Sequence, residues 1–322
     1  MGLHDSGVPH HSWYWYVEVY LIEWRGRRSS DTKNVDMSGV VVEVGQSVTS
    51  FKPGDLVIGF AHGLCSQNLD NCAFQTYVLV KANAAAIMPA SMDFIKGASL
   101  PTAVGTATMC LADVFGLSIP GWTSVSNQAP SASAALLVWG GASAGVGAMT
   151  IQLARMAGLT VFATASKHQH SRLISLGATE VVDYHSPTVV DELIVAAERA
   201  GKNIVYAVDA ISTEETLTAV MDTLRRSSKP DTQSIISHTT PWPTNVARPD
   251  DIAARQVRGD DLWGRREDLC AWLYGEALPK WLQDGSIIPS PIKTIEGGIE
   301  GIQNGLNELR KGVSGEKLVV RI

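Results

Sequence analysis

The chain has 322 residues, 45% of them hydrophobic and 18% charged, which is enough for two domains with buried cores. Its formal net charge is −6, and because no stretch is rich in lysine and arginine, a nucleic-acid partner is not expected. The four cysteines are widely spread and form no CxxC pair, which argues against a disulfide framework and favours reduced thiols in the cytoplasm.

The first thirty or so residues contain an aromatic run at positions 13–16. Aromatic residues could anchor a chain at a membrane interface, but the same composition is typical of an ordinary β-strand. Glu18 and Glu23 interrupt the apolar run, which is too short to cross a bilayer. The sequence therefore predicts a strand here and no membrane partner.

Residues 40–90 have the pattern of short strands joined by tight turns. The apolar stretches 40–44 and 56–60 are separated by the turn formers Pro53, Gly54 and Asp55, and residues 73–90 repeat the pattern. We expect the first third of the chain to be a β-rich unit.

From residue 134 onward, apolar strands alternate with helical segments. Strands are expected at 135–140, 160–166, 180–184, 203–210 and 234–238, and helices between them. Such near-continuous apolar strands are buried on both faces, so this part predicts an α/β fold with a doubly wound parallel sheet. After about residue 265 the pattern changes to a helix, a loop with Pro289 and Pro291, another helix and a final strand at 317–322, which we expect to rejoin the β-rich unit.

A cluster of small residues, AxAGxG at positions 142–147, joins the first of these strands to the next helix. Small residues there let backbone N–H groups approach a dinucleotide pyrophosphate at the helix N-terminus. The alternative is a plain packing turn, but the strand before and the helix after favour a dinucleotide site.

The next strand ends on Ser166 and Lys167, where an enzyme that uses NAD commonly has an acidic residue. A hydroxyl and an ammonium group would suit the 2′-phosphate of NADP, which a carboxylate would repel. NADP(H) is therefore the expected cofactor. The alternative is that Lys167 is only a solvated residue at a helix start.

Several phrases of the chain together resemble the medium-chain dehydrogenase/reductase superfamily, in its zinc-free, quinone-oxidoreductase-like and fungal enoyl reductase branch. They are SGVVVEVGQSVTSFKPGDLVIGF, LPTAVGTATMCL, GGASAGVGAMTIQLA, LGATEVVDYHSP and VSGEKLVVRI. The resemblance implies a Rossmann NADP-binding domain at 108–274 and a GroES-like catalytic domain built from 1–107 and 275–322. Residues 1–35 do not resemble the usual N-terminal stretch, which is either diverged or truncated.

The resemblance also implies roles for single residues around a nicotinamide cofactor. Gly145 and Val146 would lie at the pyrophosphate, Ser166 and Lys167 at the 2′-phosphate, and Tyr184 at the adenosine end. Ile211 and Ser212 would border the ribose and nicotinamide, and Leu318 and Val319 would cover the cofactor. Thr106 would face the nicotinamide as the one catalytic donor. Tyr184 could instead be an aromatic cap at a strand end, and Thr106 a helix-start hydroxyl.

Zinc members of the superfamily carry a Gly-His-Glu stretch before the GVVVEVG strand, where this chain has Asp36, Met37 and Ser38. Cys65 and Cys72 have a spacing that suits no usual structural zinc site, and His62 would be a lone ligand. We expect no metal.

Without a Lewis acid, an activated C=C bond is an easier hydride acceptor than an isolated ketone. The predicted activity is NADPH-dependent reduction of an enone, an enoyl group or a quinone, with a polyketide synthase as a possible partner. The alternatives are a protein that binds NADP(H) without turnover and a zinc alcohol dehydrogenase.

Overall fold

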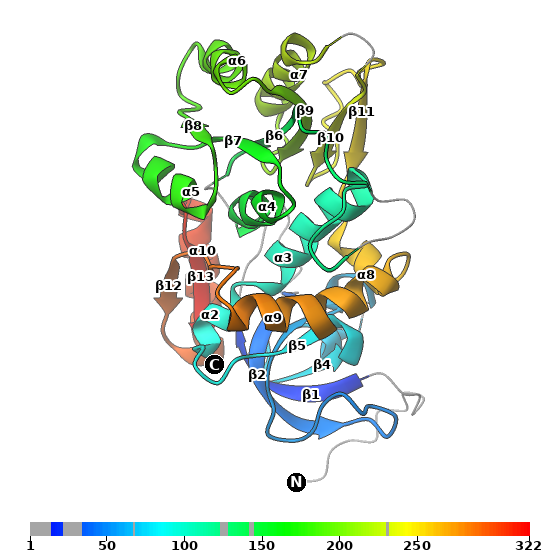
Figure 1. Ribbon diagram of the computed structural model, residues 1–322. Helices are drawn as coiled ribbons and strands as arrows, with labels where there is room; N and C mark the ends of the chain where they lie inside the picture. Colours follow the sequence, from blue (N-terminus) through cyan, green and yellow to red (C-terminus); the bar gives the residue numbers. More distant parts are fainter. Residues whose placement is uncertain (1–13, 22–33, 67, 123–127, 142–144, 230–231) are drawn as a thin grey trace.

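The computed structural model describes residues 14–21, 34–66, 68–122, 128–141, 145–229 and 232–322. These residues form a β-rich half that contains the first strands and the end of the chain, and a second half built on a parallel sheet (Figure 1). None of the helices within those ranges is long and apolar enough to cross a membrane.

The β-rich half contains a seven-stranded sheet in the order β12-β13-β1-β2-β3-β5, with β4 paired to β1. Its core includes Met37, Val57 and Val80 from this sheet. The strands are β1 (Tyr14–Leu21), β2 (Asp36–Val44), β3 (Leu56–Phe60), β4 (Tyr77–Lys81), β5 (Ala85–Ile87), β12 (Ile292–Ile295) and β13 (Lys317–Arg321). The helices of this half are α1 (Gly63–Ser66), α2 (Phe94–Ala98) and α10 (Gly298–Lys311).

Two expectations for this half are met, and one element was not foreseen. The aromatic run forms β1, apart from Trp13, which lies outside the described residues. The terminal strand β13 pairs antiparallel with β1 and so returns the end of the chain to the first sheet. The proline loop contains an additional strand, β12, which runs parallel to β13.

The second half contains a six-stranded sheet in the order β11-β10-β9-β6-β7-β8, in which every neighbouring pair is parallel. This is the doubly wound arrangement of a Rossmann fold. Its strands are β6 (Ala134–Trp139), β7 (Thr160–Thr164), β8 (Glu180–Val182), β9 (Asn203–Asp209), β10 (Ser234–His238) and β11 (Ile252–Gln256). The sequence predicted five of them, and β11 is an additional edge strand that contains Arg255.

Helices cover both faces of the parallel sheet, as the near-continuous apolar strands require. All six residues of β6 are buried, and alternate residues contribute to two separate cores. The helices α4 (Gly145–Met156) and α5 (His170–Leu176) cover one face, and α6 (Val189–Arg199) and α7 (Glu214–Ser227) cover the other.

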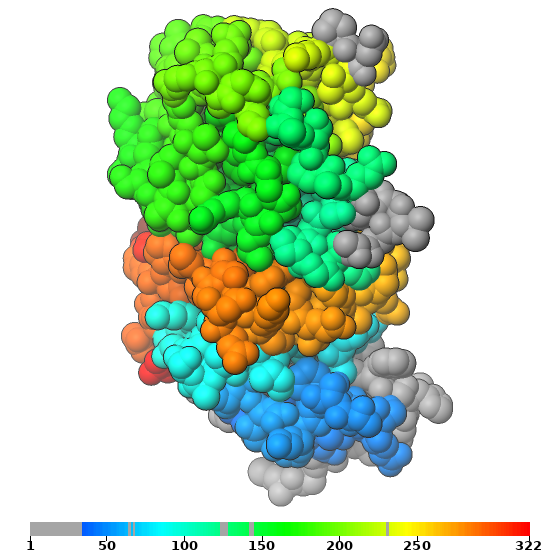
Figure 2. Space-filling view, in the orientation of Figure 1, coloured from blue at the N-terminus to red at the C-terminus, as the bar shows by residue number. Residues whose placement is uncertain are grey.

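Helical segments join the two halves. Pro101 begins α3 (Pro101–Thr108), which continues into a π-helical stretch at Met109–Val114. Later in the chain, α8 (Glu267–Trp272), a π-helical stretch at Leu273–Ala277 and α9 (Leu278–Gln283) follow one another. These later segments form a band between the two halves on the face drawn in Figure 2.

Candidate active site

The proposed pyrophosphate turn lies between β6 and α4, and its central residues 142–144 are outside the described residues. A Cβ atom on Gly145 would lie 2.7 Å from Cε of Lys317 and 2.8 Å from Cβ of Ala103. One on Gly147 would lie 2.6 Å from the carbonyl oxygen of Gly140. Both positions therefore favour glycine, because the start of α4 packs closely against β13, α3 and the end of β6, as the glycine that lets helix and strand approach does in a dinucleotide turn. Val146 is half-buried at the same helix start.

Ser166 and Tyr184 come together beyond the carboxyl ends of β7 and β8. The Ser166 hydroxyl donates a hydrogen bond to the Tyr184 hydroxyl at 3.4 Å, and both residues leave polar groups at the surface. Lys167 follows Ser166 directly and is exposed. The structure thus brings two hydroxyls into contact, and the residue that follows Ser166 in the chain carries an ammonium group.

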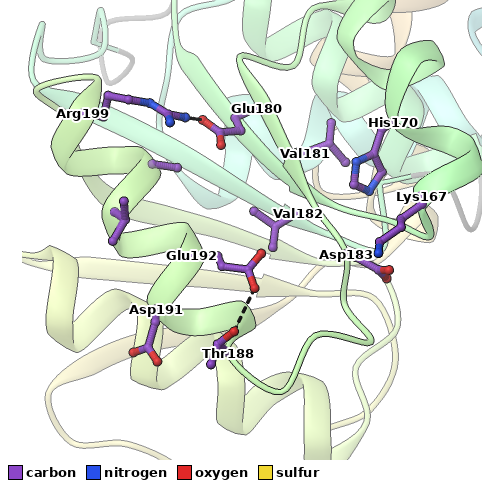
Figure 3. A pocket seen from close by; sticks show the side chains of 12 residues that line it. Lys167, His170, Glu180, Val181, Val182, Asp183, Thr188, Asp191, Glu192 and Arg199 are labelled. Carbon is purple, nitrogen blue, oxygen red and sulfur yellow. Dashed lines mark hydrogen bonds and ion pairs between the residues drawn. The ribbon is translucent and has the colours of Figure 1, made fainter.

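Lys167 also lines an open hollow of 430 Å³ along β8, between α5 and α6 (Figure 3). The Asp183 carboxylate lies at the same end of the hollow as Lys167, whereas the ion pair of Glu180 and Arg199 lies at the other. Hydrogen bonds from the backbone N–H of His185 at 3.1 Å and from its ring at 2.8 Å lower the pKa of Asp183, and the charge of Lys167 contributes. An ionised carboxylate therefore accompanies the cation that the sequence assigns to the 2′-phosphate.

Ile211 and Ser212 form a tight turn after β9, held by the carboxylate of Asp209. Asp209 accepts hydrogen bonds from the backbone N–H groups of Ile211 at 2.9 Å and Ser212 at 2.8 Å, and from the Thr216 hydroxyl at 2.6 Å. Burial raises the pKa of Asp209, although these hydrogen bonds act in the opposite direction. Ser212 has a φ of 59°, in the left-handed region that non-glycine residues rarely adopt. Asp209 was not predicted as a site residue, although an acidic residue at a strand end before a turn is a usable signal.

Thr106 lies on α3 and is 7% exposed. A Cβ on Gly259 would be 3.7 Å from its hydroxyl oxygen and 3.2 Å from Cζ of Phe60. The Phe60 ring lies 4.2 Å from the Trp263 ring, which in turn lies 4.7 Å from the ring of His62. Aromatic side chains therefore extend from the surroundings of Thr106 to His62.

The imidazole of His62 is partly buried beside Trp263. Its Nδ1 atom is buried and has no hydrogen-bond partner within the described ranges. Burial lowers the pKa of His62, and the nearby charge of Lys81 acts in the same direction. The ring is therefore neutral at pH 7.

Leu318 and Val319 are both buried in β13. Neighbouring side chains of a strand point to opposite faces of the sheet, so Val319 shares a face with Lys317, and Leu318 points the other way. Since Lys317 and Ala103 both approach Gly145, the starts of β13 and α3 lie against the start of α4. The contacts at Gly145 thus link the proposed diphosphate turn to α3, which carries the residue assigned to the nicotinamide, and to β13, which carries the residues assigned to cover the cofactor.

Comparisons with known proteins agree with this architecture. The family model described as "Alcohol dehydrogenase GroES-like domain" matches residues 7–90, and the one described as "Zinc-binding dehydrogenase" matches residues 145–229. The first match includes part of the N-terminal stretch whose sequence differs from the usual pattern.

Two curated relatives align along most of the chain. "Dehydrogenase azaJ" of Aspergillus niger is 35% identical and covers 89% of this chain and 81% of its own. "Lovastatin nonaketide synthase, enoyl reductase component lovC" of Aspergillus terreus is 29% identical and covers 89% of this chain and 80% of its own. Among solved structures, a "putative zinc-dependent alcohol dehydrogenase protein" from Rhizobium etli has a TM-score of 0.75 at 21% identity and covers 96% of this chain and 89% of its own. The last comparison supports the fold.

Proposed function

Since the chain belongs to the medium-chain dehydrogenase/reductase superfamily, in its enoyl reductase branch, we propose that this oxidoreductase uses NADPH to reduce an activated C=C bond or a quinone without a metal ion. The membership itself implies a nicotinamide cofactor. The choice of NADPH and the absence of a metal are the proposal.

The contact between Ser166 and Tyr184, with Lys167 next to Ser166 in the chain, is the observation that supports the choice of NADPH. The three side chains come from two adjacent strand ends, and a hydrogen bond of 3.4 Å joins the two hydroxyls. The 2′-phosphate is the group that distinguishes NADPH from NADH, and it needs donors and positive charge. Asp183 reduces the net charge at this place, so we expect a preference for NADPH and some residual use of NADH.

In the proposed reaction, a bound nicotinamide supplies a hydride to the β-carbon of an α,β-unsaturated carbonyl compound. The protein holds the acceptor, excludes water and stabilises negative charge on the carbonyl oxygen. Thr106 is the proposed hydrogen-bond donor to that oxygen, because it is a 7% exposed hydroxyl residue on α3, the helix whose start packs against the diphosphate turn. A proton from solvent then completes the α-carbon.

The residues at the position of the zinc ligands do not fit a metal ion. Asp36, the acidic residue of that stretch, accepts two hydrogen bonds from Thr102 and pairs with Lys317. In the part of the chain that the structure describes, no group of three or more His, Cys, Asp or Glu residues could hold a metal. The proposed mechanism therefore contains no metal-dependent step.

The acceptor is proposed to be a small enone, an enoyl thioester or a quinone. An enoyl thioester could be presented by a polyketide synthase, and the relative from Aspergillus terreus, whose name contains "enoyl reductase component" of a synthase, supports that partner. The acidic net charge of the chain gives no reason to expect a nucleic acid.

Oxidation of NADPH by the purified chain tests the proposal. Enals, 2-enoyl pantetheine thioesters and menadione-like quinones are supplied in turn, with NADH in a parallel series. Acceptor-dependent loss of absorbance at 340 nm that is faster with NADPH is the expected result. Tight NADPH binding without oxidation by any acceptor would instead indicate a protein that binds the cofactor without catalysis.

A further inference from the structure

A buried ion pair lies outside the set of residues that the sequence assigned to the site. The ammonium group of Lys317 in β13 lies 3.3 Å from a carboxylate oxygen of Asp36 in β2, and the two side chains are 2% and 1% exposed. Removing two charges from water is costly, and a buried ion pair often stabilises a protein no better than apolar side chains would. Stability alone therefore does not account for the pair, and its contacts with neighbouring groups indicate what else it does.

The carboxylate of Asp36 also fixes the start of α3. One of its oxygens accepts hydrogen bonds from the backbone N–H of Thr102 at 2.6 Å and from the Thr102 hydroxyl at 2.5 Å. The preceding carbonyl, that of Pro101, accepts a hydrogen bond from the Tyr274 hydroxyl at 2.8 Å. Burial raises the pKa of Tyr274 well above its ordinary value, so this hydroxyl stays protonated and continues to donate.

Thr102 and Thr106 are four residues apart on α3. Residues at this spacing lie on the same face of a helix, about one turn apart. A shift or rotation of the helix at Thr102 would therefore move the hydroxyl of Thr106 by a similar amount.

Lys317 connects the same group of residues to the diphosphate turn. Its Cε and Nζ atoms would lie 2.7 Å and 3.3 Å from a Cβ placed on Gly145, and Ala103, next to Thr102, would lie 2.8 Å from it. The start of α4 therefore packs directly against the ion pair and the start of α3.

We propose that Asp36 and Lys317 are a positioning pair, which acts through Thr102 to hold Thr106 at a fixed place relative to the Gly145 turn. The inference rests on the proposed function, which places the nicotinamide at Thr106 and the diphosphate at the Gly145 turn. A displacement of about 1 Å at a reacting centre can cost on the order of 100-fold in rate, so such a pair can matter for turnover without touching the substrate.

The experiment removes one hydroxyl and keeps the shape of the side chain. Thr102→Val loses the 2.5 Å hydrogen bond to Asp36, and Thr102→Ser retains it. Thr108→Val is the matched control, because Thr108 is a buried threonine of the same helix whose hydroxyl has no partner among the described residues. Each variant is assayed for kcat, KM for NADPH, the primary isotope effect with NADPH deuterated at C4, NADPH affinity by fluorescence and Tm.

We expect Thr102→Val to lower kcat roughly 10- to 100-fold and to increase the isotope effect, with NADPH affinity within about threefold of wild type. Thr102→Ser and Thr108→Val should stay within about twofold in kcat. A Thr102→Val variant with a lower Tm but unchanged kcat and isotope effect would show a merely structural contact and overturn the proposal.

Two further results separate this inference from the proposed function. If the wild-type chain reduces acceptors but Thr102→Val does so equally well, only the positioning pair is refuted. If the wild-type chain binds NADPH and reduces nothing, both are refuted. Because removal of Asp36 alone leaves a buried cation, Asp36→Leu is tested together with Lys317→Met, and this double variant, which loses every hydrogen bond of Asp36 to Thr102, should lose at least as much kcat as Thr102→Val.

Discussion

Lys167 is the residue whose replacement most clearly separates the two dinucleotides. It is exposed, lies three residues after the end of β7, and follows Ser166, whose hydroxyl is hydrogen-bonded to that of Tyr184. The proposed contact is between its ammonium group and the 2′-phosphate. NADH lacks that phosphate, so Lys167→Ala and Lys167→Glu should affect the two dinucleotides unequally.

The expected size of the effect follows from the exposure of the side chain. Two unit charges about 4 Å apart interact with about 1 kcal/mol in water and about 4 kcal/mol at an effective dielectric constant near 20. An exposed lysine belongs near the lower end, at about 1–1.5 kcal/mol, because solvent screens it. Lys167→Ala should therefore raise KM for NADPH about 5- to 10-fold.

Reversal of the charge adds repulsion to the lost attraction. Lys167→Glu should therefore raise KM for NADPH by roughly 50- to 100-fold, with less than about threefold change for NADH. Higher ionic strength should reduce the difference between wild type and variant, because the contact is exposed.

Replacement of Asp183, which lines the same hollow, should change KM for NADPH in the opposite direction. Asp183→Asn removes the carboxylate beside Lys167 and should lower KM for NADPH a few-fold, while KM for NADH stays the same. Asp191→Asn is the matched control, because Asp191 lines the same hollow but pairs with Arg226 on α7. Initial rates with one acceptor and both dinucleotides provide all the constants. Equal changes for NADPH and NADH in Lys167→Glu would refute the phosphate contact.

Three other predictions concern the reacting centre, acid stability and metal. Thr106→Val should lower kcat roughly 10- to 100-fold, and Thr106→Ser should keep most of it; equal rates in all three proteins would exclude the proposed donor. Burial acts to raise the pKa of Asp113, but hydrogen bonds from Arg265 and Arg266 outweigh it and hold the pKa below its ordinary value. Its stabilising contribution is thus complete above about pH 4 and is lost as the pH falls further. Asp113→Asn should therefore lower Tm by about 5 °C at pH 7, and the difference should shrink in thermal melts near pH 3. Dialysis against a chelator should leave NADPH oxidation unchanged, and a loss of activity restored by zinc would contradict the metal-free mechanism.

The regular elements could be predicted where local sequence decides them. β6 is buried along its whole length, so its apolar run is visible in the sequence, and the small residues that follow mark the start of α4. The contact between Ser166 and Tyr184 was not predicted; it follows from the parallel pairing of β7 and β8, which brings the carboxyl ends of both strands to one edge of the sheet.

Other features depend on residues that are far apart in the chain. β11 lies at the edge of the sheet and pairs only with β10, so it is partly exposed and contains Arg255. Its sequence therefore lacks the continuous apolar run by which the other strands were predicted. Asp36 and Lys317 are 281 positions apart, and neither residue type indicates its partner. Their contact follows from the pairing of the terminal strand with the first sheet, which brings β13 to the start of α4.

The fate of the hydride tests the central claim most directly. The purified chain is mixed with NADPH carrying two deuterium atoms at C4 and with a 2-enoyl pantetheine thioester in ordinary water, and the product is analysed by mass spectrometry and NMR. The proposed function predicts a saturated thioester with one deuterium on the β-carbon and a proton from water on the α-carbon. Bound NADPH that stays reduced with this thioester and with the enals and quinones supplied in parallel, or NADPH oxidation that forms no reduced acceptor, would contradict it.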